Sequence, residues 1–312
     1  MAVIPALLVQ GVQMALVLLL APLLTGLTRK VKARLQRRQG PSLIQPYRDL
    51  KRLLSKDVVL AENASWLFRV VPYVIFAVTW VAAALVPTFA TGLLFSWSGD
   101  LIAITALLGS ARFAQALAAM DVGTSFGGIG ASREMLIASL AEPAMLMIAL
   151  SVALIAGSTQ LSTIADYMAF SAVGLRVTLA LGLVALVIVA LAENARIPVD
   201  NPATHLELTM VHEAMVLEYS GRHLAMIELA ASLKLLLYIS VIACIFFPFG
   251  LAQGYVIGLI AYLLKLAVAG VLLSVFETSI AKMRVFRVPN FLGAALMLAL
   301  LGVLLRFVSE GM

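Results

Sequence analysis

Residues 193–222 form a polar stretch that reads ENARIPVDNPATHLELTMVHEAMVLEYSGR. Five carboxylates and two arginines lie in it, and the three histidines lie in it or directly after it: His205, His212 and His223. Long apolar runs flank the stretch on both sides. A segment this rich in charge is unusual in so apolar a chain, so we take it as the first candidate for a functional region.

The composition is that of an integral membrane protein. The chain has 312 residues, of which 62% are hydrophobic and 12% charged, and its mean hydropathy is +1.05. Soluble domains are about 45–50% apolar and about 25% charged. In lipid the backbone must satisfy its own hydrogen bonds, so membrane spans are helices or closed barrels. The apolar runs are long and lack the alternation of a barrel, and they predict an all-α, polytopic fold.

We expect about eight transmembrane helices in a single membrane domain, residues 1–312. A bilayer core of about 30 Å needs about 20 apolar residues per helix. The apolar runs lie at about 3–24, 68–90, 99–120, 135–156, 175–193, 226–249, 253–276 and 289–309. A count of seven or nine would leave the class unchanged and move the far terminus to the other side.

Basic residues give the predicted orientation. Sixteen of the 22 lysines and arginines fall in four loops, residues 28–57, 121–134, 194–225 and 277–288. None falls in the opposite loops, near 91–98, 157–174 and 250–252. By the positive-inside rule the first set is cytoplasmic, which places both termini outside. The net charge of +6 is therefore a topology signal, and with no recognition motif we expect no nucleic acid partner.

The first basic loop contains a predicted amphipathic helix that begins near Pro46. Its apolar side chains recur at i, i+4, i+7 and i+11: Leu43, Tyr47, Leu50 and Leu54. Its basic side chains fall on the other side: Arg48, Lys51 and Arg52. Such a helix lies along the membrane interface. Two interpretations stay open, attraction to anionic lipid and docking of a soluble subunit.

No motif predicts a cofactor or metal bound to this chain. The single Cys244 excludes ligation by paired cysteines within the chain. Loop 121–134 has four glycines but lacks the lysine of a phosphate-binding loop, so we expect a tight turn. His205 and His212 share a helix side but lack further ligands at suitable spacing. We therefore expect no catalytic residue here, and any redox centre in partner proteins.

Four charged side chains fall more than three residues from either end of the predicted spans: Arg112, Glu142, Lys234 and Lys265. Charges in hydrocarbon are costly, and each is a functional candidate by default. Lys265 is twelve residues from Glu277, about 18 Å along a helix and near the middle of the bilayer. The other three lie closer to an interface, which a long side chain can reach by snorkelling.

Glu142 has a second carboxylate on its own helix face. Glu134, Ala138 and Glu142 recur every four residues, and Pro143 frees a backbone carbonyl one turn back. A line of carboxylates running inward from the cytoplasm suits proton uptake, because burial and nearby cations together can bring proton exchange near neutral pH. The alternative is a static pair with a basic residue that only fixes helix packing.

Two pairs in the polar stretch have the spacing of helix neighbours. Glu193 and Arg196 are three apart, and Glu218 and Arg222 are four apart. Both spacings favour ordinary surface ion pairs.

Four loops together resemble one family. Residues 37–41 (RRQGP) with 45–51 (QPYRDLK), and 193–200 with Glu207 and 218–221 (EYSG), are similar to subunit 1 of complex I. The remaining matches resemble the hydrogenase branch of that family, the membrane anchor of group 4 NiFe hydrogenases of the hydrogenase-4 and formate hydrogenlyase type. They are residues 123–126 (GTSF), 130–134 (GASRE), 142–143 (EP), 276–277 (FE) and 283–289 (MRVFRVP).

The resemblance implies a non-catalytic subunit in the cell inner membrane. Such a subunit docks the hydrogenase large and small subunits on its cytoplasmic face and passes coupling to antiporter-like membrane subunits. Ni-Fe and Fe-S centres would lie in those partners, and none in this chain. Residue pattern and resemblance together give ten proton-coupling candidates: Arg112, Glu134, Glu142, Glu193, Asp200, Glu207, Glu213, Glu218, Lys234 and Lys265. They also give seven docking or loop candidates: Arg37, Arg38, Arg48, Asp49, Lys51, Arg196 and Tyr219.

Two other functions stay open at this point. In complex I the matching loop lines a quinone chamber, so the chain could be a quinone-site subunit of a NADH dehydrogenase. Residues 202–207 (PATHLE) stand where the family commonly has P-E-A-E, and this departure weakens the quinone interpretation. A stand-alone secondary ion transporter would show internal repeats, and we find no convincing repeat between the two halves.

Overall fold

The computed structural model describes residues 3–170, 177–200, 210–251 and 254–310. Within these ranges the chain is nearly all helical, with one isolated bridge between Asp100 and Gln160. The elements are α1 (Val3–Leu35), α2 (Gln45–Leu54), α3 (Trp66–Leu85), η1 (Ser96–Ser98), α4 (Leu101–Asp121), α5 (Ser125–Ala156), α6 (Leu161–Phe170), α7 (Val177–Glu193), α8 (His212–Val216), α9 (Gly221–Phe246), α10 (Tyr255–Ser279), η2 (Val285–Arg287) and α11 (Val288–Glu310).

The predicted class, an all-α polytopic membrane protein, is confirmed. Among the described residues seven helices are long and apolar enough to cross a membrane: α1, α3, α4, α5, α9, α10 and α11. A further apolar helix, α7, is shorter at 17 residues. These eight helices fall on the eight predicted runs.

Several segments differ from the sequence prediction. Residues 28–35, expected to begin the first basic loop, continue α1, and residues 212–216 of the expected loop 194–225 form α8. Residues 125–134, expected to be part of a glycine-rich turn, are the first turns of α5. The glycines there allow close packing, because a Cβ at Gly127 would lie 2.3 Å from the Ala119 carbonyl oxygen. In the expected loop 157–174, residues 161–170 form α6. That helix is too short to give a spanning signal.

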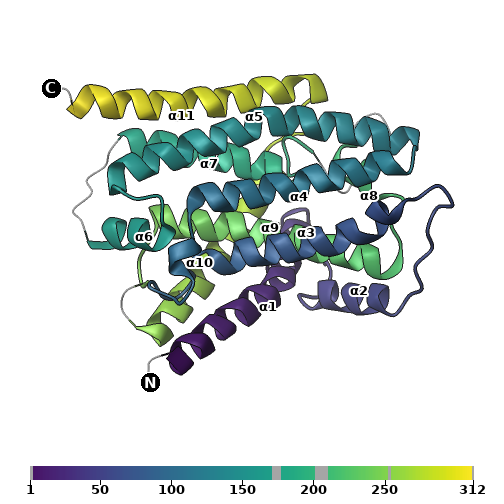
Figure 1. The fold of residues 1–312 in the computed structure, drawn as a ribbon, viewed down its shortest axis with the longest axis horizontal. Helices are drawn as coiled ribbons and strands as arrows, with labels where there is room; N and C mark the ends of the chain where they lie inside the picture. The colour runs from purple at the N-terminus through teal and green to yellow at the C-terminus, as the bar shows by residue number, and fades with distance from the viewer. Residues whose placement is uncertain (1–2, 171–176, 201–209, 252–253, 311–312) are drawn as a thin grey trace.

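The helices pack around α9, the most buried of the candidate spans. Figure 1 shows α9 inside the bundle, with α5, α7 and α11 on one side and α1 on the other. α9 contacts α1, α2, α3, α6 and α7, while α5 contacts α4, α7 and α11. α10 and α11 are the most exposed of these helices. Their exposed side chains are large and apolar, as expected for helices that contact lipid or membrane partners.

Hydrogen bonds tie the predicted basic loops together at one end of the bundle. The Ser220 hydroxyl donates to the Val59 carbonyl and accepts from the Val59 N–H, both at 2.8 Å. The Asp121 carboxylate accepts from the Ser65 N–H at 2.8 Å. At the other end, the Leu101 N–H donates to the Thr159 carbonyl at 3.1 Å. The loops are thus grouped as the predicted orientation requires, and the side of the membrane they face stays a prediction.

The predicted amphipathic helix is confirmed as α2. Pro46 lies in its first turn and is buried. α2 packs on α1 and α9, and the Tyr47 hydroxyl donates to the Leu19 carbonyl of α1. The chain before α2 runs so close to α1 that a Cβ at Gly26 would lie 2.3 Å from the Leu43 carbonyl oxygen. The helix is therefore fixed to the bundle through its apolar side.

Candidate functional site

A cluster of five charged residues lies between α4, α5, α7 and α9, and we call it the Arg112 cluster: Arg112, Glu134, Glu142, Glu193 and Lys234. Its centre is the Arg112 side chain, which is 4% exposed. Arg112 is nine residues from the end of α4 at Asp121, about 14 Å along the helix. The sequence prediction that this arginine snorkels to the interface is therefore not needed, because it has carboxylate partners inside the bundle.

Arg112 contacts three carboxylates from two other helices. Its Nε lies 3.4 Å from Oε1 of Glu134, and its Nη1 lies 3.9 Å from Oε1 of Glu142, both on α5. Its Nη2 pairs with Oε1 of Glu193, the last residue of α7. The predicted shared face of Glu134 and Glu142 is thus observed, and both carboxylates turn to the same cation.

Lys234 of α9 provides the second cation. Its ammonium nitrogen lies 3.8 Å from Oε2 of Glu193, whose side chain is 4% exposed. When every group is ionised, three carboxylates and two cations leave the cluster with a net charge of −1. Inside a bundle an uncompensated negative charge costs more free energy than in water, because charges interact more strongly there.

Glu142 is the member of the cluster that is most exposed at the molecular surface, since its side chain is 42% exposed. Space for its carboxylate comes from Gly109 on α4, where a Cβ would lie 3.2 Å from Oε1 of Glu142. The cluster therefore extends from the buried Glu193 to the exposed Glu142, which lies near the middle of α5.

His212 of α8 lies next to the Arg112 cluster on the side of the polar stretch. Its Nδ1 lies 3.5 Å from Nε2 of the buried Gln115, one turn along α4 from Arg112. Burial lowers the pKa of His212 below its usual 6.5, and the Lys234 charge lowers it further, while Glu134, Glu213 and Asp200 oppose the shift. A neutral imidazole held between these carboxylates can both accept and donate a proton.

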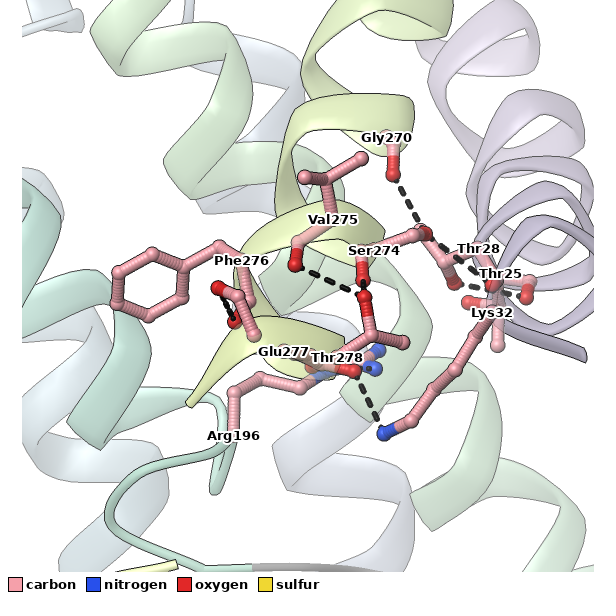
Figure 2. Close-up of polar contacts among 11 residues, drawn as sticks. Thr25, Thr28, Lys32, Arg196, Gly270, Ser274, Val275, Phe276, Glu277 and Thr278 are labelled. Carbon is pink, nitrogen blue, oxygen red and sulfur yellow. Dashed lines mark hydrogen bonds and ion pairs between the residues drawn. The ribbon is translucent and has the colours of Figure 1, made fainter. Parts of the chain in front are cut away.

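A second group of charges lies at the loop end of the bundle, and we call it the Glu277 cluster: Lys32, Arg196 and Glu277. Glu277, near the end of α10, is 3% exposed and binds both cations. The Lys32 ammonium of α1 lies 2.9 Å from its Oε2, and Nη1 of Arg196 lies 3.3 Å from its Oε1 (Figure 2). Burial lowers the pKa of Arg196, and Glu277 opposes that shift. The cluster fastens the segment after α7 to α1 and α10.

A hydrogen bond beside it strengthens the same contact. The Ser274 hydroxyl lies 3.2 Å from the Thr28 carbonyl oxygen of α1 and 2.8 Å from the Gly270 carbonyl oxygen of its own helix (Figure 2). Gly270 lets the helices approach, since a Cβ there would lie 3.2 Å from Leu24.

Asp200 joins the polar stretch to the segment before α11. Its Oδ1 accepts from the Lys282 ammonium at 2.7 Å, and its Oδ2 from the Val211 N–H at 3.3 Å. The Met283 N–H donates to the Pro198 carbonyl at 2.9 Å. The polar stretch is thus attached to α1, α10 and the 282–283 segment.

The predicted surface pair of Glu193 with Arg196 is wrong. α7 ends at Glu193 and the chain turns at Ala195, whose φ is 48°. Helix spacing therefore does not apply, and the two side chains bind Arg112 and Glu277 respectively. Glu218 is exposed, and no ion pair joins it to Arg222 within the part of the chain that the structure describes.

Three other proton-coupling candidates lie away from the cluster or outside the structure. Glu207 lies outside the described residues. Glu213 of α8 is half-buried and lies near His212. Lys265 is half-buried on α10, which contributes no member of the Arg112 cluster, and it has no ion pair among the described residues.

The docking candidates divide into exposed and buried groups. Arg37, Arg38, Arg48 and Lys51 are exposed. Asp49 is half-buried, accepts from Gln45 and lies 3.5 Å from Arg52. Arg196 is occupied by Glu277, and the buried Tyr219 ring stacks on Phe68 at 3.9 Å. Arg196 and Tyr219 therefore contact other residues of the bundle and are not part of an exposed docking surface.

Sequence reasoning missed the role of Glu277. In the sequence, Glu277 stands out only as part of the family match at 276–277 and as the reference point for the depth of Lys265. A signal was present, because Glu277 is an acid at the end of an apolar run in a loop otherwise rich in basic residues. Within the described ranges no three His, Cys, Asp or Glu side chains are arranged so that they could hold a metal ion.

Fold and site together define a multi-pass membrane protein with ion pairs buried between its helices. The sequence profile of the NADH dehydrogenase family matches residues 8–307. The chain belongs to this family.

Relatives narrow the comparison. Formate hydrogenlyase subunit 4 of Escherichia coli K12 is 33% identical over 284 residues, 89% of this chain and 92% of the relative. Hydrogenase-4 component C of the same organism is 35% identical over 277 residues, 87% of each chain. NADH-quinone oxidoreductase subunit 8 of Rhodothermus marinus is 30% identical over 262 residues, 80% of this chain and 73% of the relative.

The fold also has a solved counterpart. A chain in the structure of the membrane-bound sulfane sulfur reductase, an archaeal respiratory membrane complex, superposes with a TM-score of 0.80. It covers 96% of this chain and 99% of its own length at 22% identity. This likeness supports the fold.

Proposed function

We propose that the chain is the membrane anchor and proton-coupling subunit of a membrane-bound hydrogenase complex in the cell inner membrane. The two E. coli relatives are named as subunits of formate hydrogenlyase and hydrogenase-4, and they support the choice of complex. The observation that carries the coupling role is the Arg112 cluster, with its buried end at Glu193 and its open end at Glu142.

The charge balance of the cluster suits proton transfer. With a net charge of −1, the cluster becomes neutral when one of its three carboxylates takes a proton. A buried site responds to nearby charge, because an added anion favours protonation and an added cation favours loss. His212 provides a neutral relay on the loop side, and Glu142 provides the exit toward a neighbouring membrane subunit.

The partners follow from the two ends of this path. The basic loops face the cytoplasm, with both termini outside, and the exposed Arg37, Arg38, Arg48 and Lys51 dock the hydrogenase large and small subunits. Antiporter-like subunits lie beside the Glu142 face within the bilayer. The Ni-Fe and Fe-S centres belong to the soluble subunits, and this chain holds no cofactor of its own.

The test is Glu142→Gln in the intact complex in sealed vesicles. We expect proton translocation to fall at least about tenfold while hydrogen evolution with a soluble electron donor stays near the wild-type rate. Glu62→Gln is the matched control, because Glu62 is exposed in the loop before α3, and it leaves both rates unchanged. Full proton translocation in an assembled Glu142→Gln complex contradicts the coupling role.

One relative favours a second function. The Rhodothermus marinus relative is named as a NADH-quinone oxidoreductase subunit, so a quinone-site role is the alternative. Quinone-site inhibitors decide between the two: they block turnover of a quinone-reducing complex and leave a hydrogenase with a soluble donor unaffected.

A further inference from the structure

Lys265 is a cation near the middle of α10, a helix long and apolar enough to cross a membrane. It is ten residues from the start of α10 at Tyr255 and fourteen from its end at Ser279, about 15 Å and 21 Å along the axis. An extended lysine reaches about 6 Å. With α10 crossing a bilayer, we therefore expect the ammonium to lie several ångströms inside the hydrocarbon in either direction.

The described part of the chain offers Lys265 no counter-ion. Among these residues no carboxylate lies within the 4.0 Å of an ion pair. The Cys244 thiol of α9 is near enough to interact electrostatically with Lys265, and also with Asp166 of α6. Arg112 and Lys234, which also lie deep inside described spans, both have carboxylate partners. Among these three deep cations of the described residues, Lys265 is the one without a carboxylate partner.

The side chain lies at the edge of an open helix face. α10 packs against α1 and more lightly against α9. Its other side is apolar and exposed, with Leu264 at 65%, Val268 at 50% and Leu272 at 63%. α10 is among the least buried of the candidate spans, and the part of it that is visible in Figure 1 lies next to α1. A second helix can lie along this face and meet Lys265 from the side.

We propose that this face of α10 binds a transmembrane helix of a partner subunit that carries an aspartate or glutamate, which pairs with Lys265. Charge complementarity selects this occupant. A lipid tail covers the apolar side chains but provides no anion at this depth, whereas a membrane helix provides both an apolar surface and a carboxylate. The inference rests on the proposed function only in that the chain works within a membrane complex.

Photo-crosslinking tests the occupant with Lys265 in place. A benzoyl-phenylalanine at position 264 in the native complex is expected to crosslink a membrane-spanning peptide that contains Asp or Glu, identified by mass spectrometry. The same probe at Leu301 of α11, which is 46% exposed, is the control and does not capture that peptide. Crosslinks to lipid alone, or to a helix without a carboxylate, overturn the proposal.

Charge variants test the pairing. Lys265→Met, which keeps the length and removes the charge, is expected to lower co-purification of the crosslinked subunit at least about fivefold, and Lys265→Arg to preserve it. Neutralising the partner's carboxylate together with Lys265→Met restores association relative to either change alone. Asp166→Asn, the control at an acid of α6 that interacts electrostatically with Cys244, has no effect. Wild-type co-purification with Lys265→Met overturns the proposal.

These outcomes are separate from those of the coupling test. The crosslink and the co-purification report which helix lies beside α10 and do not depend on proton movement. A complex in which Glu142→Gln has no effect can still crosslink at position 264, and a complex that couples protons normally can fail to do so.

Discussion

The Arg112 cluster has more carboxylates than cations, whereas the Glu277 cluster has more cations than carboxylates. The first sets three carboxylates against two cations between α4, α5, α7 and α9. The second sets one carboxylate against two cations where α1, α10 and the polar stretch meet. An excess of carboxylates leaves room for a proton, whereas a single acid held by two cations fixes three segments in place. Both clusters are buried, so it is the ratio of carboxylates to cations that supports the proposed proton-responsive role for the Arg112 cluster and a structural role for the Glu277 cluster.

The largest effect is expected for Arg112→Met. Three carboxylates lose their common cation, and breaking a buried pair by removing one partner costs about 3–5 kcal/mol. We expect little assembled complex, measured by thermal unfolding and by the amount of protein in the membrane. Adding Glu134→Gln and Glu193→Gln restores part of the stability, because fewer anions are left unpaired. Wild-type stability for Arg112→Met would show that the cluster is not held by this cation.

A smaller loss is expected for Glu277→Gln. The amide still accepts a hydrogen bond, and Lys32 is 24% exposed, so solvent compensates part of the loss. Arg196, at 17% exposed, loses more, and we expect about 1–3 kcal/mol in thermal unfolding. Lys32→Met is the comparison and costs less than Glu277→Gln. The reverse order would mean that Lys32, and not Arg196, is the main partner of Glu277.

His212, beside the Arg112 cluster, is expected to make the stability of the folded protein depend on pH. Its pKa is lowered in the folded protein, so below about pH 6.5 the unfolded chain binds the proton more readily, and folding loses stability as the pH falls. His212→Asn removes this contribution. We expect the wild-type melting temperature to fall more steeply than that of the variant between pH 7.5 and pH 5.5. Parallel curves would show that His212 titrates alike in both states.

The smallest effect is expected on α2. Asp49 and Arg52 lie 3.5 Å apart, and the arginine is 67% exposed. Exposed pairs contribute about 0–1 kcal/mol, so Asp49→Asn is expected to leave thermal unfolding within that range. A loss as large as that of Glu277→Gln would mean that α2 is a buried element in the assembled protein.

The fold was predictable where the sequence has long apolar runs, since the eight runs match eight helices. α6 was not, because ten residues in a short loop give no spanning signal. The start of α5 was misread because glycines indicate turns by themselves, and only the facing Ala119 backbone shows that they allow close packing.

The site was predictable only within single helices. The shared face of Glu134 and Glu142 follows from helix spacing, and both were found. Their partner Arg112 and the tie between Glu193 and Lys234 join different helices, and no spacing rule reaches across that distance in sequence. The same limit produced the wrong pair of Glu193 with Arg196, because the turn at Ala195 ends the helix on which the rule depends.

The hydrogen bonds between Ser220 and Val59 bear on the order in which contacts form while the chain is being synthesised. The two residues are 161 positions apart, so the segment before α3 leaves the ribosome long before its partner exists. At about 5–20 residues per second the wait is on the order of 10–30 s. For most of that interval α1 and α3 are already made while the Val59 segment lacks this hydrogen-bond partner. The end of the first loop is therefore joined to the polar stretch only once the start of α9 has been made.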